Sequence, residues 1–256
     1  MSDSDSVKVV DLKGKQLATH VGADATTQVE VKNGLLKHTE EEITSEYHYG
    51  RNEVELKGDR VTVRPRRHKY VFKTKKKVPK AGVMLVGLGG NNGSTVVGAV
   101  TANRLGLTWK TKNGVKKSNY WGSLTQATTI YVGCSKDGKE VHIPFKSVLP
   151  MVNPNDLVIG GWDINGANLA QAMERACVFD PDLQRQLAPH MRHIVPLPGI
   201  YYPDFIAANQ SDRANNILRN KTKQEDLEQI RRDIRDFKRK HALGSLSILW
   251  TAHTGR

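Results

Sequence analysis

The sequence predicts an α/β fold: a Rossmann-type parallel sheet with helices on both faces, preceded by a small β-rich N-terminal segment. Short apolar runs alternate with helical patterns from residue 81 onward, the order expected of parallel strands joined by crossover helices. Residues 28–74 instead show short alternating segments separated by Gly and Asp, with an Asn-Gly turn expected at Asn33–Gly34, which is typical of antiparallel strands. We therefore expect residues 1–77 to form a flexible N-terminus and a β-rich lead-in, and residues 78–256 to form the Rossmann-type domain.

The strands of the parallel sheet are expected where short apolar runs occur. The first run, AGVMLVGL at 81–88, is bounded by Pro79 and by glycines, which suits a strand buried on both faces. Further strands are expected at 128–133, 157–161, 193–197 and 245–250.

The helices are expected at 92–105, 165–178, 204–219 and 225–243, with a further one beginning at 180–181. The last has the clearest pattern, since apolar residues recur at spacings of three and four, namely Leu227, Ile230, Ile234 and Phe237. Gly106 and Gly244 supply helix stops. Residues 108–123 are rich in Lys, Asn and Gly, so we expect a loop there.

Composition excludes several classes of protein. With 38% hydrophobic and 25% charged residues among 256, the chain is expected to be globular. The sequence contains no run of about 18 apolar residues, so no membrane span is expected. The N-terminus lacks the apolar core of a signal peptide, so a cytoplasmic location is expected. Only two cysteines, Cys134 and Cys177, are present; a disulfide framework is excluded and no zinc spacing can be drawn.

The net charge of +13 is concentrated in one stretch. Residues 64–80 hold nine Lys or Arg and no acid, and the rest of the chain carries only +4. Such a run can attract nucleic acid, an acidic membrane or a nuclear import receptor. No aromatic stacking platform or nucleic-acid motif accompanies it, so we expect a solvated basic strand and linker and keep nucleic-acid binding as an alternative.

A glycine- and asparagine-rich turn, GLGGNNGS at 87–94, follows the first apolar strand and opens a helix. Glycines allow positive φ and let the backbone approach a pyrophosphate, and the helix N-terminus offers free N–H groups. The spacing departs from G-x-G-x-x-G because Asn92 stands at the third glycine. Asparagine tolerates the left-handed region and can donate hydrogen bonds. The turn at 87–93 therefore predicts dinucleotide binding.

The residues alone leave the choice between NAD and NADP open. The acidic residue usually found about 20 positions after the turn is missing, and that window is basic. Its lysines favour a 2′-phosphate and hence NADP: Lys110, Lys112, Lys116 and Lys117. Alternatively, an insertion separates the turn from the next strand, and Asp163 binds the ribose. Asp163 could equally be a loop residue or the N-cap of the following helix.

Several segments together resemble the myo-inositol-1-phosphate synthase (inositol-3-phosphate synthase) family: VMLVGLGGNNGST, NYWGSLTQATT, GWDIN, PLPGIYYPDFIAANQSDRANN and LWTAHT. The resemblance runs from about residue 46 to residue 254. It implies a cytoplasmic, typically tetrameric, NAD-dependent isomerase that converts glucose 6-phosphate to inositol 3-phosphate and feeds phosphatidylinositol synthesis. In that reaction NAD oxidises the sugar at C5, enolisation and aldol closure follow, and NADH reduces the ring ketone.

The resemblance also implies which residues bind NAD. Gly89, Gly90, Asn91 and Asn92 match the pyrophosphate turn, and Asp163 matches the ribose-binding acid, which favours NAD over NADP. The remaining candidates for the nucleotide site are Gly199, Ile200, Gln210, Arg213, Thr251, Ala252, His253 and Thr254. Three positions depart from the family pattern: Gly199 replaces a serine, His253 replaces an asparagine and Gly255 replaces an acidic residue.

Family members are considerably longer, and the resemblance places the catalytic lysines and most of the sugar-phosphate site in their second half. We therefore expect a truncated or alternatively spliced synthase chain that binds NAD, has no catalytic residues of its own and is inactive alone. Glucose 6-phosphate would be a substrate only after completion by the missing half. The alternative from another class is a non-catalytic regulatory subunit that co-assembles with full-length synthase or as a homo-oligomer, without a membrane partner.

Overall fold

The computed structural model describes residues 9–10, 16–20, 30–32, 34–205 and 208–252. The chain divides into two compact units: Met1–Val78 with Tyr120–Met151, and Pro79–Asn119 with Val152–Arg256. Residues 120–151, which the sequence analysis assigned to the range 78–256, thus belong to the N-terminal unit. The expected flexibility of the first residues concerns positions that lie mostly outside the described part.

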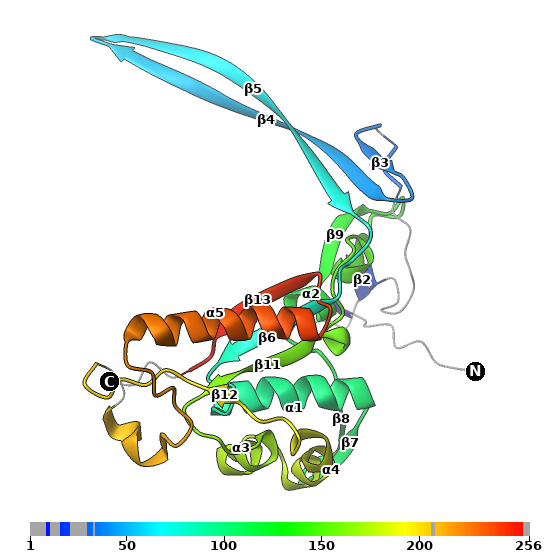
Figure 1. Ribbon diagram of the computed structural model, residues 1–256. Helices are drawn as coiled ribbons and strands as arrows, with labels where there is room; N and C mark the ends of the chain where they lie inside the picture. Colours follow the sequence, from blue (N-terminus) through cyan, green and yellow to red (C-terminus); the bar gives the residue numbers. More distant parts are fainter. Residues whose placement is uncertain (1–8, 11–15, 21–29, 33, 206–207, 253–256) are drawn as a thin grey trace. The chain divides into compact units, whose positions relative to one another are not determined.

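The second unit is built on a four-stranded sheet in the order β12-β11-β6-β13. Its strands are β6 (Ala81–Val86), β11 (Val158–Asp163), β12 (Leu197–Pro198) and β13 (Ser245–Trp250), and every pairing is parallel. The first strand lies inside the sheet with later strands on both sides, which is the doubly wound arrangement. The expected Rossmann-type fold is confirmed (Figure 1).

Helices cover both faces of this sheet (Figure 1). On one face lie α1 (Asn91–Leu105), α3 (Leu169–Ala176) and α4 (Pro181–Met191), and on the other lies α5 (Lys223–Lys240). The buried core joins β6 to the first three helices through Leu85, Leu88, Val97, Ala102, Leu169, Ala172, Met173, Leu183, Leu187 and Met191.

Helix α5 packs closely on the sheet because two strand residues have no side chain. A Cβ on Gly160 would lie 2.5 Å from Cε2 of Phe237, and one on Gly82 would lie 2.4 Å from Cδ1 of Leu243. The indole Nε1 of Trp162 in β11 also donates to Asp233 of α5 at 2.9 Å. The helix begins with a capping box between Thr222 and Glu225, which satisfies N–H groups that a helix start leaves unpaired.

Three sequence-based expectations about the second unit are wrong in detail. The helix expected at 204–219 is only the 3₁₀ helix η3 (Ala208–Arg213), because the following residues bond to neighbouring strand ends. Asn216 N donates to Ile164 O and Leu218 N donates to Gly199 O. The loop expected at 108–123 contains a hairpin of β7 (Thr108–Thr111) and β8 (Gly114–Lys117). The strand expected at 193–197 is reduced to the short β12.

One sheet of the first unit draws on distant parts of the chain. Strand β9 (Thr129–Cys134) pairs with β10 (Glu140–Pro144), which pairs with β2 (Gln16–His20), and β2 pairs with β1 (Val9–Val10). The strand expected at 128–133 therefore exists, but it lies outside the parallel sheet. The short helix α2 (Leu124–Ala127) and the 3₁₀ turn η1 (Phe145–Ser147) flank these strands, while η2 (Pro154–Asp156) precedes β11.

The other sheet of the first unit is dominated by one long hairpin. Strands β4 (Glu42–Lys57) and β5 (Arg60–Lys75) pair residue by residue along 16 positions each, and β3 (Leu36–His38) adds to β4. The sequence pattern predicts shorter strands interrupted by glycine, but Gly50 continues the ladder opposite Arg67. The chain turns instead at Gly58, whose φ is +55°. The turn expected at residues 33–34 involves Asn33, which lies outside the described residues.

Candidate nucleotide-binding site

The glycine turn is held against the end of β11. The backbone N–H groups of Gly87 and Leu88 both donate to Trp162 O at 2.9 Å. Gly87 has a φ of +91°, a conformation that glycine adopts without strain. Gly90 N then donates to Gly87 O at 3.0 Å, and Gly90 is the N-cap of α1. The predicted strand–turn–helix connection is therefore formed as the dinucleotide motif requires.

Gly93 allows the first turn of α1 to sit directly on this connection. A Cβ there would lie 2.4 Å from Leu88 O and 2.6 Å from Gly87 O. Gly90 provides no side-chain cap, and the helix has no acidic residue in its first turn. The first N–H groups of a helix have no partner inside it. The start of α1, at Asn91 and Asn92, therefore offers backbone donors and the positive end of the helix dipole to an anion.

Asp163 lies beside the turn, at the carboxyl end of β11. Its side chain is buried, with 6% of the residue exposed, and Oδ1 accepts a hydrogen bond from Asn165 N at 2.9 Å. A Cβ on Gly89 would lie 3.1 Å from its Cγ and 3.2 Å from its Oδ2. The N-cap of α3 is Asn168 rather than Asp163. The structure thus brings Asp163 to the glycine turn, as the insertion alternative predicts.

Two further predicted residues, Arg213 and Gly199, lie beside Asp163, and two more, Gln210 and Ile200, adjoin them. Nη2 of Arg213 is 3.7 Å from Asp163 Oδ1, and Nη1 of Arg213 donates to Gln210 Oε1 at 3.0 Å. A Cβ on Gly199 would lie 3.3 Å from the backbone carbon of Asp163. Ile200 follows Gly199 in the chain and is 39% exposed.

The segment after β13 lies on the other side of the turn. Thr251 donates to Val86 O at 2.9 Å through both its backbone N–H and its Oγ1. Nδ2 of Asn92 donates to Thr251 O at 3.4 Å. A Cβ on Gly87 would lie 2.7 Å from Cα of Ala252. The other two candidates in this segment, His253 and Thr254, lie outside the described residues.

Two residues that no sequence motif indicates also shape the site. Nη2 of Arg175 donates to Gly89 O at 2.5 Å. Burial and the nearby Arg213 guanidinium lower the pKa of Arg175, while Asp163 opposes that change. Nδ2 of Asn216 donates to Asp163 O at 3.0 Å and to Pro196 O at 3.2 Å. The sequence does not indicate a site role for Arg175, because a basic residue is ordinary in the last turn of a helix. For Asn216, the paired asparagines of ANQSDRANN are the sequence feature that could have indicated one.

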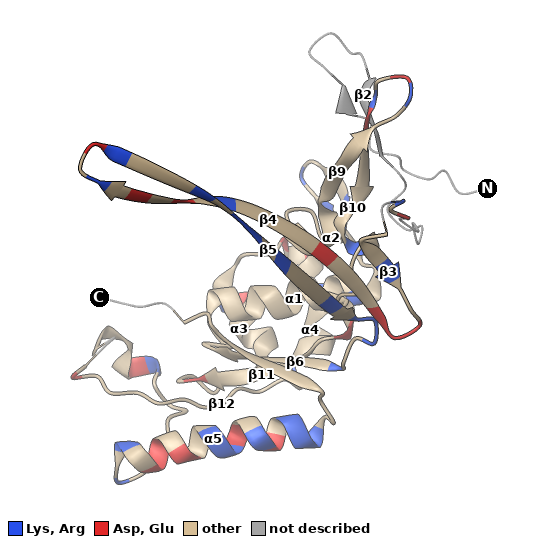
Figure 2. Ribbon diagram, turned by 90° about the horizontal axis from the view of Figure 1, so that it is seen from above, with Lys and Arg blue, Asp and Glu red and all other residues tan. Residues whose placement is uncertain are grey.

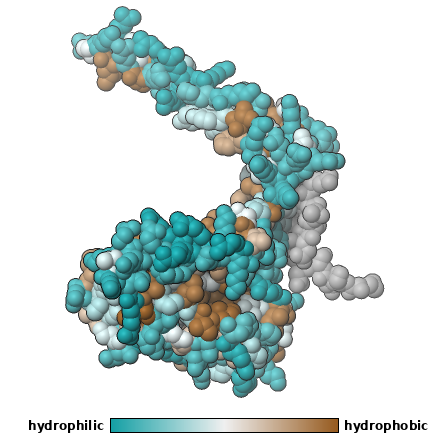
Figure 3. Space-filling view, viewed as in Figure 1, coloured by the Kyte–Doolittle hydropathy of each residue, from teal (hydrophilic) through white to brown (hydrophobic). Residues whose placement is uncertain are grey.

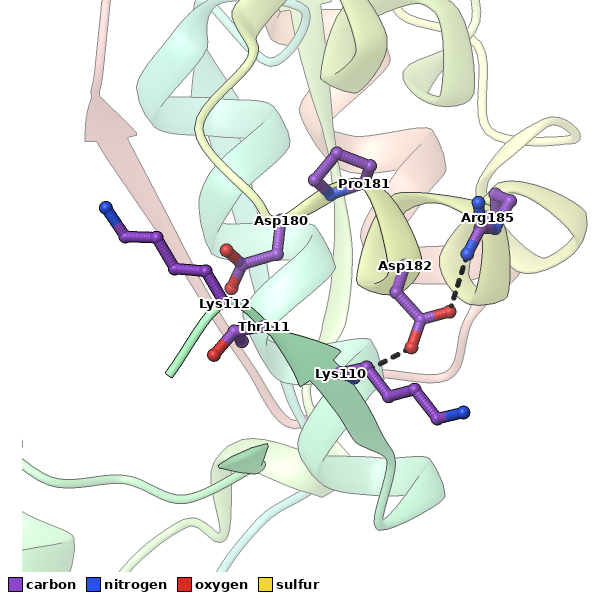
Figure 4. Close-up of a pocket in the computed structure, with 7 residues that line it drawn as sticks. All are labelled: Lys110, Thr111, Lys112, Asp180, Pro181, Asp182 and Arg185. Carbon is purple, nitrogen blue, oxygen red and sulfur yellow. Dashed lines mark hydrogen bonds and ion pairs between the residues drawn. The ribbon is translucent and has the colours of Figure 1, made fainter. Parts of the chain in front are cut away.

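The lysines that favoured a 2′-phosphate belong to a different place in the fold. Lys110 and Lys112 line a hollow with Thr111, Asp180, Pro181, Asp182 and Arg185, none of which belongs to the glycine turn (Figure 4). Asp182 accepts hydrogen bonds there from Lys110 N at 2.8 Å and from Arg185 at 3.0 Å. Nζ of Lys116 lies 3.8 Å from Asp180. Asp180 and Asp182 thus offset part of the positive charge around this hollow, through Lys116 and Arg185 respectively.

Much of the basic run at 64–80 lies on β5 opposite the glutamates of β4 (Figure 2). Four cross-strand ion pairs form, joining Arg64 to Glu55, Arg66 to Glu53, Lys69 to Glu46 and Lys73 to Glu42, at 2.7, 2.9, 2.8 and 3.2 Å. These pairs reduce the positive charge that the run presents to a polyanion.

Apolar side chains also gather near the far end of this hairpin (Figure 3). Val54 lies opposite Val63 and Leu56 lies opposite Val61, and all four are at least half exposed. The hairpin therefore presents a mixed surface rather than a continuous basic one.

The described residues form neither a metal-binding cluster nor a membrane-spanning helix. No group of three or more His, Cys, Asp or Glu is arranged to hold a metal ion. No helix in the same part of the chain is long and apolar enough to cross a membrane. His190 and His193 are both exposed.

Comparisons with known proteins agree on one family. Residues 81–256 match a profile for an NAD-binding domain described as myo-inositol-1-phosphate synthase. Inositol-3-phosphate synthase of Dictyostelium discoideum is 55% identical over 226 residues, covering 88% of this chain and 44% of that protein. The synthase of Mesembryanthemum crystallinum is 54% identical, covering 88% and 45%. The crystal structure of inositol-3-phosphate synthase from Caenorhabditis elegans matches with a TM-score of 0.85 and 48% identity, over 90% of this chain and 45% of that one.

Proposed function

Because the chain belongs to the myo-inositol-1-phosphate synthase family, we propose that its glycine turn and the adjoining strand ends form the NAD site of an inositol-3-phosphate synthase. One observation carries the proposal. The turn after β6, Asp163 at the end of β11 and Thr251–Ala252 after β13 meet at one edge of the parallel sheet. Ligands of doubly wound sheets bind at the carboxyl ends of strands, beside the point where the strand order reverses.

The residues at this edge fit a dinucleotide. Gly89 and Gly90 leave the backbone bare where a pyrophosphate would approach, and the N–H groups of Asn91 and Asn92 would receive it at the start of α1. Asp163 would accept a hydrogen bond from a ribose hydroxyl. The segment at Thr251 and Ala252 would border the nicotinamide, with Gly199, Ile200, Gln210 and Arg213 on the side of Asp163.

The proposed activity is the conversion of glucose 6-phosphate to inositol 3-phosphate. NAD, when bound, supplies a hydride acceptor and donor for it. The chain spans about 45% of the length of the relatives it matches. Proton transfers during ring closure need acid–base groups beside the sugar. The family resemblance implies that these groups include catalytic lysines, and it places those lysines in the part of the relatives outside the match. The contribution proposed for these 256 residues is therefore cofactor binding and orientation.

The same resemblance supports proposals about the location, the pathway and the assembly of the protein. We propose a cytoplasmic isomerase subunit that acts in inositol and phospholipid biosynthesis and assembles with further copies or with longer synthase subunits.

A calorimetric titration of the purified chain with NAD tests the proposed site, with Asn92→Asp as the informative variant. The added carboxylate would face the cofactor phosphates and would remove the amide that donates to Thr251 O. We expect saturable binding to the unmodified chain and at least about tenfold weaker binding to the variant, a loss of about 1.4 kcal/mol. Asn113→Asp, in the β7–β8 turn, introduces the same charge elsewhere and should bind like the unmodified chain.

Two results would contradict the proposed site. One is a folded chain that gives no saturable heat with NAD. The other is equal NAD affinity in Asn92→Asp and the unmodified chain. The activity is tested separately by assaying inositol phosphate formation from glucose 6-phosphate: we expect none from the chain alone, and turnover by it would overturn the assignment of the chemistry to other residues.

A further inference from the structure

The peptide that joins Gly89 to Gly90 lies at the centre of the glycine turn and is hydrogen-bonded at both ends. Gly90 N donates to Gly87 O at 3.0 Å, and Gly89 O accepts from Nη2 of Arg175 at 2.5 Å. The first bond stays within the turn, whereas the second comes from the last turn of α3, 86 residues along the chain. A side chain of a separate helix therefore fixes the direction of the Gly89 carbonyl.

Close contacts favour glycine on both sides of this peptide. A Cβ on Gly89 would lie 3.1 Å from Cγ of Asp163, and a Cβ on Gly90 would lie 3.1 Å from Gly87 O. Glycine, however, restricts its own backbone angles less than any other residue. Two glycines in succession let their shared peptide rotate unless another group holds it. Rotation would break both hydrogen bonds and displace Gly90, which is the N-cap of α1.

Arg175 is not needed to complete its own helix. A basic side chain in the last turn of a helix can bond the free carbonyl oxygens there. In α3 the backbone N–H of Cys177 donates to the carbonyl oxygens of Met173 and Glu174 instead. Within the described part of the chain, the bond to Gly89 O is the one hydrogen bond or ion pair that Arg175 forms. The guanidinium is therefore committed to the glycine turn.

We propose that Arg175 is a positioning residue for the cofactor: by holding the Gly89 carbonyl, it keeps the glycine turn in the conformation that receives a pyrophosphate. The inference rests on the proposed NAD site and adds a residue of α3 that controls the shape of its phosphate-binding turn. A loop that is already ordered in its bound conformation loses less freedom when the ligand binds. Removing Arg175 should therefore weaken every ligand whose pyrophosphate occupies the turn.

Calorimetric titration tests the effect on binding in the unmodified chain, Arg175→Met, Arg175→Lys and Arg235→Met. The ligands are NAD and ADP-ribose, which has the same pyrophosphate but lacks the nicotinamide. We expect Arg175→Met to lose about tenfold in affinity for both ligands, as for one lost charge-assisted hydrogen bond. Arg175→Lys should regain part of the loss, because its ammonium can still donate to a carbonyl oxygen.

Arg235→Met is the matched control, because Arg235 is exposed on α5, on the opposite face of the sheet from α3. It removes the same charge and should bind both ligands like the unmodified chain. Repeating the titrations at about 1 M salt, where exposed charges are screened within about 3 Å, should leave the loss in Arg175→Met in place.

Hydrogen exchange of the Gly90 amide, followed by NMR without any ligand, tests the positioning itself. This N–H is bonded to Gly87 O. In Arg175→Met we expect it to exchange at least about tenfold faster through local opening of the turn. The midpoint of denaturant-induced unfolding should stay close to that of the unmodified chain, because the buried residues of α3 remain: Leu169, Ala172 and Met173.

The outcomes separate this inference from the proposed function. NAD binding that is equally tight in Arg175→Met and the unmodified chain overturns the inference alone. A loss of affinity without faster Gly90 exchange also overturns it, because Arg175 would then act on the ligand directly. A loss that vanishes at high salt does the same, since charge alone would explain it. A folded unmodified chain that binds neither ligand overturns the proposed function, and the inference with it. If Arg175→Met does not fold, Arg175→Ala, which suits a helix better, replaces it with the same expected losses.

Discussion

Gly87 and Ala252 stand so close that a Cβ on Gly87 would lie 2.7 Å from the Cα of Ala252. Gly87 follows β6 directly and Ala252 comes shortly after β13, so this contact joins the ends of two neighbouring parallel strands at the edge where the nucleotide is proposed to bind. Gly87 also has a φ of +91°. Steric room and backbone conformation therefore both require glycine at this position.

Gly87→Ala should separate these two requirements when it is compared with Gly106→Ala. Gly106 also has a positive φ, +62°, but a Cβ there would meet nothing within 4 Å. We expect Gly106→Ala to lower the unfolding free energy by about 1 kcal/mol from conformation alone. Gly87→Ala should cost about 2 kcal/mol more and should weaken NAD binding. Chemical denaturation measures the first effect and titration the second; equal costs for the two variants would contradict the crowding argument.

Gly93→Ala is expected to reverse the usual effect of alanine in a helix. Alanine normally stabilises a helix by about 1 kcal/mol relative to glycine. Here its Cβ would meet the carbonyl oxygens of Leu88 and Gly87 at 2.4 and 2.6 Å, both of them backbone atoms. We expect a loss of about 2 kcal/mol or more in denaturant-induced unfolding. Gly50→Ala, where a Cβ has no neighbour within 4 Å, should change stability by less than about 0.5 kcal/mol.

Gly199→Ser would add the hydroxyl that the family resemblance implies at this position. The new Cβ would lie 3.3 Å from the Asp163 backbone and from Ile164, so only a shift of a few tenths of an ångström is needed. We expect the unfolding free energy to stay within about 1 kcal/mol of that of the unmodified chain. NAD should bind a few-fold more tightly, because one additional hydrogen bond contributes about 1 kcal/mol net. Titration of Gly199→Ala, which adds the Cβ alone, is the control; an equal gain in both variants would rule out the hydroxyl as the cause.

Tyr202→Phe should lower the unfolding free energy, because it leaves a buried carboxylate with one hydrogen-bond donor fewer. Asp226, at the start of α5, is only 4% exposed and accepts hydrogen bonds from Tyr202 Oη at 2.5 Å and from Asn220 Nδ2 at 2.9 Å. The hydrogen bond to Asp226 raises the pKa of Tyr202. Removing this donor should lower the unfolding free energy by about 1–3 kcal/mol. In the double variant with Asp226→Asn the two costs should not add, which a denaturation cycle detects.

Acid should weaken the ion pairs of the β4–β5 hairpin. Hydrogen bonds from Lys69 to Glu46 and from Arg66 to Glu53 lower the pKa of both carboxyls. A carboxyl whose folded pKa is lowered contributes stability that is complete above its unfolded pKa and is lost as pH falls through the folded value. We expect NMR titration of the glutamate carboxyl carbons to give midpoints below the ordinary glutamate value. Salt and Lys69→Gln should return Glu46 toward that value; a midpoint unaffected by either change would show that the pair does not form in solution.

Local sequence was sufficient for the parts of the fold that depend on neighbouring residues. The apolar run before 87–93, the glycines of the turn and the periodic stripe of α5 each specify their own element, because burial period, allowed φ and capping act over a few residues. The parallel sheet follows from the alternation of strands and helices. The sequence could present Asp163 as a candidate ribose-binding residue beside the alternative of a loop or N-cap residue, since a residue at the end of a sheet strand lies at the binding edge.

Tertiary structure decided everything that depends on which segments meet. Residues 214–218 leave the helical pattern because their backbone and Asn216 bond to strand ends at Asp163, Pro196 and Gly199. Residues 120–151 join the N-terminal unit because β10 pairs with β2. Arg175 reaches Gly89 from a helix whose sequence shows only an ordinary basic C-terminus. Such contacts arise from long-range pairing and close packing, whose energies depend on partners distant in the chain, and no local pattern encodes them.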